Sequence, residues 1–207
     1  MSRPAPRRAE ILVAARHLIA THGYTQTSIR DIADAVGIMP ASMYSHFRSK
    51  AVMVERIVGG FYDELLPAQR AALAEDGSGA ECYRAMIGAV FDICADHREE
   101  VTILHYDWAT LAALDELVDV KGQTQETLDL WTGVIRRGRK DGSILKSVDP
   151  QIMERVTTSA IHTVLDTVRF TDRPLVKASR THLRRALQQT LLGGVVDPGY
   201  RSGTELA

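Results

Sequence analysis

The amino-acid sequence predicts an all-α protein. Of its 207 residues, 45% are hydrophobic and only 6% are aromatic, a composition that favours helices over sheets. Apolar residues recur with the spacing of one helical face, and Pro and Gly fall mainly at a few breaks between such stretches. No segment has the pattern of a strand. The apolar content is sufficient for a well-packed core.

Two helices are predicted near the N-terminus. The apolar positions of the first follow one helical stripe, and Gly23 is suited to its C-terminus. Thr27 and Ser28 then offer N-cap oxygens, and Asp31, three residues after Ser28, completes a variant of the capping box. A second helix is therefore expected from this point to Gly37. The stripe of the first helix consists of Ile11, Leu12, Ala15, Leu18, Ile19 and His22.

A third, short helix is expected from Pro40 to Phe47. Proline is suited to the first position of a helix because the N–H that it lacks would have no helical partner there. Ser49 is a candidate cap for a fourth helix, from Lys50 to about Glu75, with a kink at Pro67. Further helices are expected near residues 80–96, 98–117, 121–141, 149–170 and 175–193.

These helices divide the chain into three parts. Residues 1–49 are expected to form a three-helix domain, residues 50–194 a helical bundle, and residues 195–207 a loose tail, because this last segment has no periodicity. The formal net charge is −1, yet the first 56 residues carry eight Lys and Arg against four Asp and Glu. A basic N-terminal part on an acidic body indicates a nucleic-acid contact confined to one end.

The second and third predicted helices have the arrangement of a helix-turn-helix. A helix that enters the major groove of DNA must carry small or polar side chains, and Ala41, Ser42 and Ser45 meet this requirement. Tyr44 and His46 can donate hydrogen bonds to phosphate oxygens at the rim of the groove. The alternative interpretation is a helical hairpin whose aromatic residues only fill a core.

The segment TSIRDIADAVGIMPASMYSHFRSK resembles the DNA-binding signature of the TetR family of transcriptional regulators. The resemblance implies that Thr27 and Ser28 cap the second helix and touch phosphate, and that Lys50 pairs with phosphate. The chain departs from the usual pattern at Met39, where a capping Ser or Thr is common, and at Ala41, where Gly is common. The residues assigned to the DNA contact are Thr27, Ser28, Arg30, Met39, Pro40, Ala41, Ser42, Tyr44, Ser45, His46 and Lys50.

The resemblance also implies a homodimer and a small-molecule effector. In TetR-like regulators the bundle after the fourth helix binds an effector, and the last two helices pair with those of a second subunit. Leu183, Leu187 and Leu191 give the last predicted helix an apolar face suited to such an interface, although this face can also pack within one subunit. The pocket candidates are bulky or polar residues among apolar ones: Phe91, His105, Tyr106, Trp108, Trp131, His162 and Arg169.

A narrower resemblance concerns the effector. The segments GIMPASMYSHF, VRFTDRP and LLGGV are similar to a subgroup of TetR repressors that control fatty-acid or steroid-ring breakdown. The effectors of that subgroup are CoA thioesters, which implies a repressor released from a palindromic operator by an acyl-CoA. The CoA phosphates would need basic residues at a pocket mouth, and the candidates are Arg136, Arg137, Arg139, Lys140 and Arg169.

Other functional classes find little support. The sequence has no G-x-S-x-G, H-E-x-x-H, P-loop or CxxC motif, and its seven histidines are scattered, so we expect no enzyme activity, cofactor or metal. It also lacks an apolar run of the roughly 20 residues that span a bilayer, and its start lacks a secretory h-region, which predicts a cytoplasmic protein. Cys82 and Cys94 are expected to be reduced core thiols. The alternatives are a constitutive DNA-binding repressor without an effector and a helical protein–protein adaptor.

Overall fold

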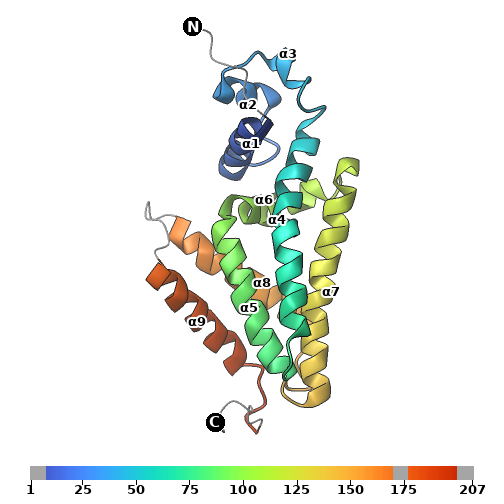
Figure 1. Cartoon of the computed structure of the whole chain (residues 1–207), viewed down its shortest axis with the longest axis vertical. Helices are drawn as coiled ribbons and strands as arrows, with labels where there is room; N and C mark the ends of the chain where they lie inside the picture. Colours follow the sequence, from blue (N-terminus) through green and yellow to red (C-terminus); the bar gives the residue numbers. More distant parts are fainter. Residues whose placement is uncertain (1–7, 170–176, 200–207) are drawn as a thin grey trace. The chain divides into compact units, whose positions relative to one another are not determined.

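The computed structural model describes residues 8–169 and 177–199, and these residues form helices joined by turns (Figure 1). Within them the only β-type pairing is an isolated bridge between Ile144 and Val196, so the predicted all-α class is confirmed. None of the described helices is long and apolar enough to cross a membrane. The helices are α1 (Arg8–His22), α2 (Ile29–Val36), α3 (Pro40–Met43), α4 (Lys50–Ala74), α5 (Gly79–Asp96), α6 (Arg98–Leu111), α7 (Val118–Asp141), α8 (Pro150–Arg169) and α9 (Lys177–Gly193), with a 3-10 turn η1 (Asp115–Leu117) before α7.

Two predicted helices are shorter in the structure than the sequence pattern indicated. Helix α3 ends at Met43 instead of Phe47, and the next residues form a turn in which the Ser45 and His46 amides donate to carbonyls three residues earlier. Both Met43 and Phe47 are buried, so each end of this turn is held by the core. Helix α6 ends at Leu111 instead of residue 117.

The contacts divide the chain into two compact units. The head unit contains the described residues up to Asp63 together with His97–Gln123, and the bundle unit contains Glu64–Asp96 and the described residues from Thr124 onward. Helix α6 packs against α1 and therefore belongs to the same compact unit as the N-terminal helices. Helix α4 contributes its first half to the head unit and its second half to the bundle unit.

The core of the head unit follows the predicted helical stripe. Ile11, Ala15 and Ile19 of α1 are buried, and α1 packs against α2, whose Ile32 and Val36 face inward. Gly37 ends α2 with a φ of 74°, a left-handed conformation that a residue with a Cβ adopts only at a cost. The chain can therefore turn sharply into α3, which packs against α2.

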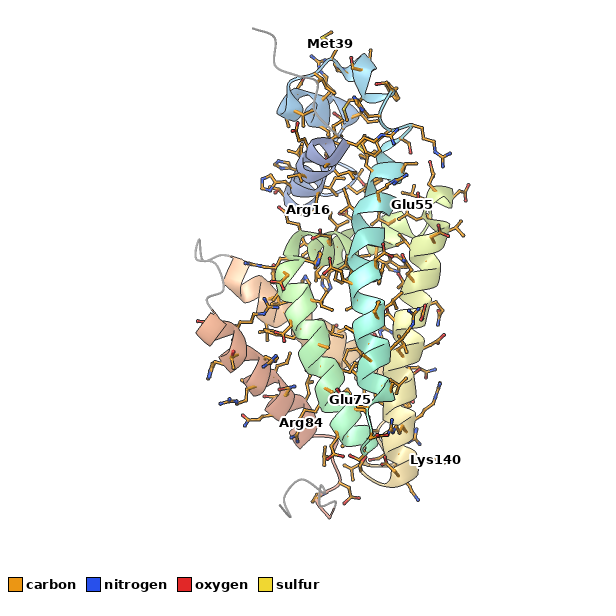
Figure 2. All side chains as sticks on the ribbon, in the orientation of Figure 1. Arg16, Met39, Glu55, Glu75, Arg84 and Lys140 are labelled. Carbon is orange, nitrogen blue, oxygen red and sulfur yellow. The ribbon has the colours of Figure 1, made fainter. Side chains whose placement is uncertain are left out.

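Two glycines allow a close helix crossing at one end of the bundle unit. A Cβ atom added to Gly79 of α5 would lie 2.1 Å from the backbone nitrogen of Gly138 in α7, so the two helices touch through their backbones. The Arg137 guanidinium next to this crossing donates to the carbonyl oxygens of Leu73, at 2.9 Å, and of Glu75 and Gly77. Figure 2 shows Glu75 and Lys140 at this end of the bundle.

Helix α9 packs along α5 and uses its apolar face inside the subunit. Leu187 and Leu191 are only 6% and 7% exposed. The Arg180 guanidinium bridges Asp92 and Asp96, at 3.0 and 2.6 Å, and the Gln188 amide donates to the Arg84 carbonyl at 2.8 Å. Two of the three leucines predicted to meet a second subunit, Leu187 and Leu191, are therefore covered within the protein's own subunit, whereas Leu183 is half-buried.

The first residues of the predicted tail are anchored to the bundle unit. The Val195 carbonyl accepts from the Leu145 amide at 2.9 Å, and the Asp197 amide donates to the Ser143 carbonyl at 3.2 Å. Val195 is also buried. The prediction of a loose tail was wrong for this part, because the backbone of residues 195–197 pairs with the turn that follows α7. Residues 200–207 lie outside the described part of the chain.

Candidate functional site

The start of α2 is fixed by the residues that the sequence pattern selected. The Asp31 amide donates to Ser28 Oγ at 3.1 Å, and the Ser28 amide donates to the Asp31 carboxylate at 2.7 Å, which is a complete capping box. The bonds from Ser28 hold the pKa of the Asp31 carboxyl below its usual value. Thr27 is only 2% exposed, and its hydroxyl donates to the carbonyls of Gly23 and Leu18. The Thr27 hydroxyl thus fastens the turn between α1 and α2 and faces away from solvent.

Helix α3 presents a small and largely uncharged surface. Met39 is the N-cap without a side-chain cap, and Pro40 occupies the first turn, so the helix starts without the Ser or Thr that is common there. Met39 and Tyr44 are 72% and 62% exposed, and Figure 2 shows Met39 at the start of α3. The Ser45 hydroxyl donates to the Ser42 carbonyl at 2.7 Å. We call the exposed residues Met39, Ala41, Ser42, Tyr44 and Ser45 the α3 surface.

The other predicted DNA-contact residues lie at the edges of this surface. Pro40 and His46 are half-buried. Arg30 is exposed on α2, 3.8 Å from the Asp34 carboxylate. Its guanidinium is therefore held only loosely and is available to other anions.

Lys50 is engaged within the head unit. Its ammonium donates to the Thr27 carbonyl at 2.6 Å and to the Tyr24 carbonyl, and it lies 4.0 Å from the centre of the Tyr24 ring. Desolvation by burial lowers the pKa of the Lys50 ammonium. The resemblance implied a phosphate contact for Lys50, whereas in the structure the side chain ties the start of α4 to the turn between α1 and α2.

Helix α6 holds α1 through charged side chains. The Arg16 guanidinium donates to the Glu99 carboxylate at 2.7 Å and to the Glu100 carboxylate at 2.9 Å. Glu100 is buried, so this ion pair is shielded from solvent more than a surface pair would be. The Asp107 carboxylate also accepts from the Tyr24 amide at 3.1 Å. Tyr24, the residue at which the chain turns from α1 towards α2, is therefore bonded to both α4 and α6.

The predicted effector residues fall into different units. Phe91, Trp131 and His162 are buried in the bundle unit, whereas the three candidates on α6 belong to the head unit. Of these, His105 and Tyr106 are exposed and their rings contact each other edge to face, with centroids 4.9 Å apart. The side chain of Arg169 lies outside the described residues. The candidates therefore do not form one cluster within a unit.

Several buried polar side chains of the bundle unit were not among the predicted site residues. The Tyr83 hydroxyl of α5 bonds the Thr157 hydroxyl of α8 at 2.5 Å, and burial raises the pKa of Tyr83 to about 12. The Tyr83 ring contacts Trp131 of α7 nearly edge-on, with centroids 5.9 Å apart. Gln69 of α4 is fully buried. A signal was present for Gln69, because it continues the stripe of Leu65, Leu66 and Ala72, where helical periodicity expects an apolar residue.

No group of metal-binding side chains is present among the described residues. The two cysteines are buried and unpaired, as predicted, and burial raises the pKa of the Cys94 thiol to about 12. Burial also raises the pKa of the Cys82 thiol, so both thiols stay protonated at neutral pH and are poor nucleophiles.

Comparisons with known proteins give a consistent picture. Residues 11–57 match the family model described as "Bacterial regulatory proteins, tetR family", and residues 76–166 match "Tetracyclin repressor-like, C-terminal domain". The chain is 33% identical to the HTH-type transcriptional repressor KstR2 of Rhodococcus jostii (strain RHA1), over 72% of this chain and 73% of that protein.

Solved structures of regulators share the fold. The ketosteroid transcriptional regulator KstR2 of Mycobacterium tuberculosis matches with a TM-score of 0.80 and 24% identity, covering 94% of this chain and 97% of that one. AibR in complex with isovaleryl coenzyme A and operator DNA matches with a TM-score of 0.73 and 19% identity, covering 90% and 98%. The family models, the sequence similarity to a repressor and the helix-turn-helix of the head unit together show that the chain belongs to the tetR family of bacterial regulatory proteins.

Proposed function

We propose that the protein is a cytoplasmic, dimeric repressor that binds a palindromic operator through the α3 surface and leaves it when an acyl-CoA-type effector binds. The observation that carries the DNA-binding part is the α3 surface itself. Its helix is one turn long, and its exposed Ala41, Ser42 and Ser45 are small enough for the backbone to approach base edges in a major groove about 12 Å wide. The exposed Met39 offers an apolar contact of the kind that reads a thymine methyl group.

Phosphate contacts in this proposal come from the rim of the surface. The Tyr44 side chain is largely exposed at the C-terminus of α3, where its hydroxyl can donate to a phosphate oxygen. Ser28 and Arg30 at the start of α2 are exposed on the neighbouring helix. In a two-fold dimer the centres of the two half-sites are expected about 34–36 Å apart, or a multiple of this distance.

Tyr44→Phe is expected to weaken binding to a duplex selected by the protein from a randomised pool. The substitution removes only the hydroxyl, and a hydrogen bond to a charged phosphate oxygen, worth about 1.5–3 kcal/mol, corresponds to a loss of roughly 12- to 150-fold in affinity. Tyr106→Phe is the matched control, because Tyr106 is similarly exposed but lies on α6. Fluorescence anisotropy measures both affinities. Equal affinities of the two variants would remove Tyr44 from the DNA contact.

The dimer is proposed to form through the exposed face of α8. Ile152 and Val156 are 65% and 47% exposed, and Ser159 and Thr163 continue their stripe at helical spacing. Large apolar residues followed by small polar ones allow two helices to approach closely across a two-fold axis. Leu187 is unsuitable as a test of this interface, because it is buried in its own subunit and a charge there would disrupt the fold.

Val156→Glu is therefore expected to give monomers at concentrations where the unaltered protein is a dimer. A carboxylate at the centre of the interface would be desolvated without a partner. The control is Val13→Glu, which places the same charge at an exposed valine of α1. Sedimentation velocity separates the two states, and a Val156→Glu variant that stays dimeric would place the interface elsewhere.

The effector part of the proposal is supported by the similarity to a regulator that was solved with an acyl-CoA and to regulators named for ketosteroids. AibR was solved with isovaleryl coenzyme A, and the KstR2 regulators are named for ketosteroids. Arg137 is not a free cation for the CoA phosphates, because its guanidinium is bonded to three backbone carbonyls. Arg136 and Lys140 are exposed on the same helix. Arg169 remains the anion partner proposed from the sequence.

Acyl-CoAs are expected to release the protein from the selected duplex. An effector that binds the released conformation more tightly by about 1–3 kcal/mol lowers operator affinity roughly 5- to 150-fold. The titration uses isovaleryl-CoA, palmitoyl-CoA and cholyl-CoA, with Arg169→Ala and the control Arg84→Ala, which removes an exposed arginine of α5 that is not among the candidates for the CoA phosphates. Release that is weakened only in Arg169→Ala supports the assignment of Arg169. Absence of release by all three thioesters would contradict the effector class.

A further inference from the structure

We propose that Gln69 and Trp131 form a recognition site inside the bundle unit for a neutral oxygen, a carbonyl or hydroxyl group on an otherwise apolar effector. The inference rests on the proposed function in one respect, since it takes the ligand to be the effector. It goes further by naming the side chains that read the ligand and the chemical group that they select.

The two side chains come from helices that lie side by side. Figure 1 shows α4 and α7 running next to each other, and the Arg70 guanidinium of α4 donates to the Glu126 carboxylate of α7 at 2.7 Å. Further along both helices, Arg137 of α7 donates to the Leu73 carbonyl of α4 at 2.9 Å, and a Cβ atom added to Gly133 of α7 would lie 3.8 Å from the Leu73 side chain. Gln69 directly precedes Arg70 in α4, and Trp131 lies between Glu126 and Arg137 in α7. Both residues therefore belong to the stretch in which the two helices contact each other.

Three polar atoms at this level lack hydrogen-bond partners. They are Oε1 and Nε2 of Gln69 and Nε1 of Trp131, and both residues are 0% exposed. Buried polar groups in folded proteins are nearly always paired, because an unpaired group has lost its water without a replacement. Solvent does not reach these atoms in this arrangement. A ligand that enters between the helices would gain their hydrogen bonds, so the unpaired atoms favour a ligand-bound state.

The neighbouring side chains hold Trp131 in place. Its ring is packed edge-on against Tyr83, and the Tyr83 hydroxyl is already bonded to Thr157 of α8. Because this pair satisfies itself, it does not compete for the indole N–H. Helices α5, α7 and α8 thus fix the direction of one donor, while Gln69 on α4 offers both a donor and an acceptor.

The hydrogen-bonding groups determine the class of ligand. An indole N–H donates only, so it requires an acceptor such as a carbonyl or hydroxyl oxygen, and the Gln69 amide can share that oxygen or accept from a hydroxyl. Nearby cations are already in use: Arg70 pairs with Glu126, and Arg137 caps backbone carbonyls. A carboxylate would lose its hydration here without gaining a counter-charge, which is unfavourable. The site therefore selects a neutral ketone, thioester carbonyl or alcohol.

The test uses Trp131 as its own reporter. The chain has two tryptophans, so Trp108→Phe leaves Trp131 as the only indole fluorophore. The probes are 2-decalone, its parent hydrocarbon decalin, and decahydro-2-naphthoate, which share a ring system and differ in the polar group. We expect 2-decalone to change Trp131 fluorescence and to bind at least about tenfold more tightly than decalin or the carboxylate, as one to two hydrogen bonds require.

Gln69→Leu in this background is expected to abolish the preference for the ketone. It is also expected to raise the melting temperature of the ligand-free protein by about 2–4 °C, because a buried unpaired amide is replaced by an apolar side chain of similar size. Gln125→Leu is the control, since Gln125 is exposed on α7 and bonded to Asp129. This control should retain the preference for 2-decalone.

Several results would overturn the inference. They are equal binding of decalin and 2-decalone, no binding of 2-decalone, equally tight binding of the carboxylate, an undiminished ketone preference in Gln69→Leu, or a melting temperature lowered by that substitution. The last result would mean that Gln69 is paired in the ligand-free protein. Operator release by acyl-CoA is measured in a separate experiment. If acyl-CoA releases the operator but the protein does not prefer the ketone, only the site at Gln69 and Trp131 is rejected. If the protein prefers the ketone but acyl-CoA does not release the operator, the proposed effector response is rejected and the site is retained.

Discussion

The ammonium of Lys50 is the contact on which the geometry of the head unit depends. It lies against the carbonyls of Tyr24 and Thr27, at the turn that sets the direction of α2. Neither carbonyl accepts a hydrogen bond within a helix. Without Lys50, each would lose its partner, and if it remained buried this loss would cost about 1–3 kcal/mol. Because Lys50 is the first residue of α4, the helix that continues to Ala74 begins at the same point that orients the DNA-reading helices.

Tyr24 joins this contact to a second one. Its carbonyl accepts from Lys50 of α4, and its amide donates to Asp107 of α6, so a single residue is bonded to both helices. The Arg16 pairs with Glu99 and Glu100 hold the preceding helix to α6 as well. A shift of either α4 or α6 would therefore displace the turn before α2. Displacement of this turn is a route by which an effector would change operator affinity.

Features that depend on neighbouring residues could be predicted from the sequence, and those that depend on tertiary contacts could not. The capping box of Ser28 and the start of α3 at Pro40 are local, and both are found in the structure. The destination of the Lys50 side chain depends on a turn 26 residues earlier in the chain, which no pattern encodes. Likewise, periodicity showed that α9 has an apolar face at Leu187 but not that α5 covers it. Gln69 was detectable as a polar residue on an apolar stripe, but its lack of a partner required the fold.

One measurement tests most directly whether the head unit binds DNA and whether Lys50 positions α2. It is the salt dependence of operator binding, compared between the unaltered protein and Lys50→Met. For the unaltered protein, log K is expected to fall linearly with log salt concentration, because phosphate contacts release counterions. If Lys50 positions α2 without touching DNA, Lys50→Met binds more weakly at every salt concentration with the same slope. A slope smaller by about 0.9 would show that Lys50 neutralises a phosphate, and an affinity independent of salt would contradict DNA binding by the head unit.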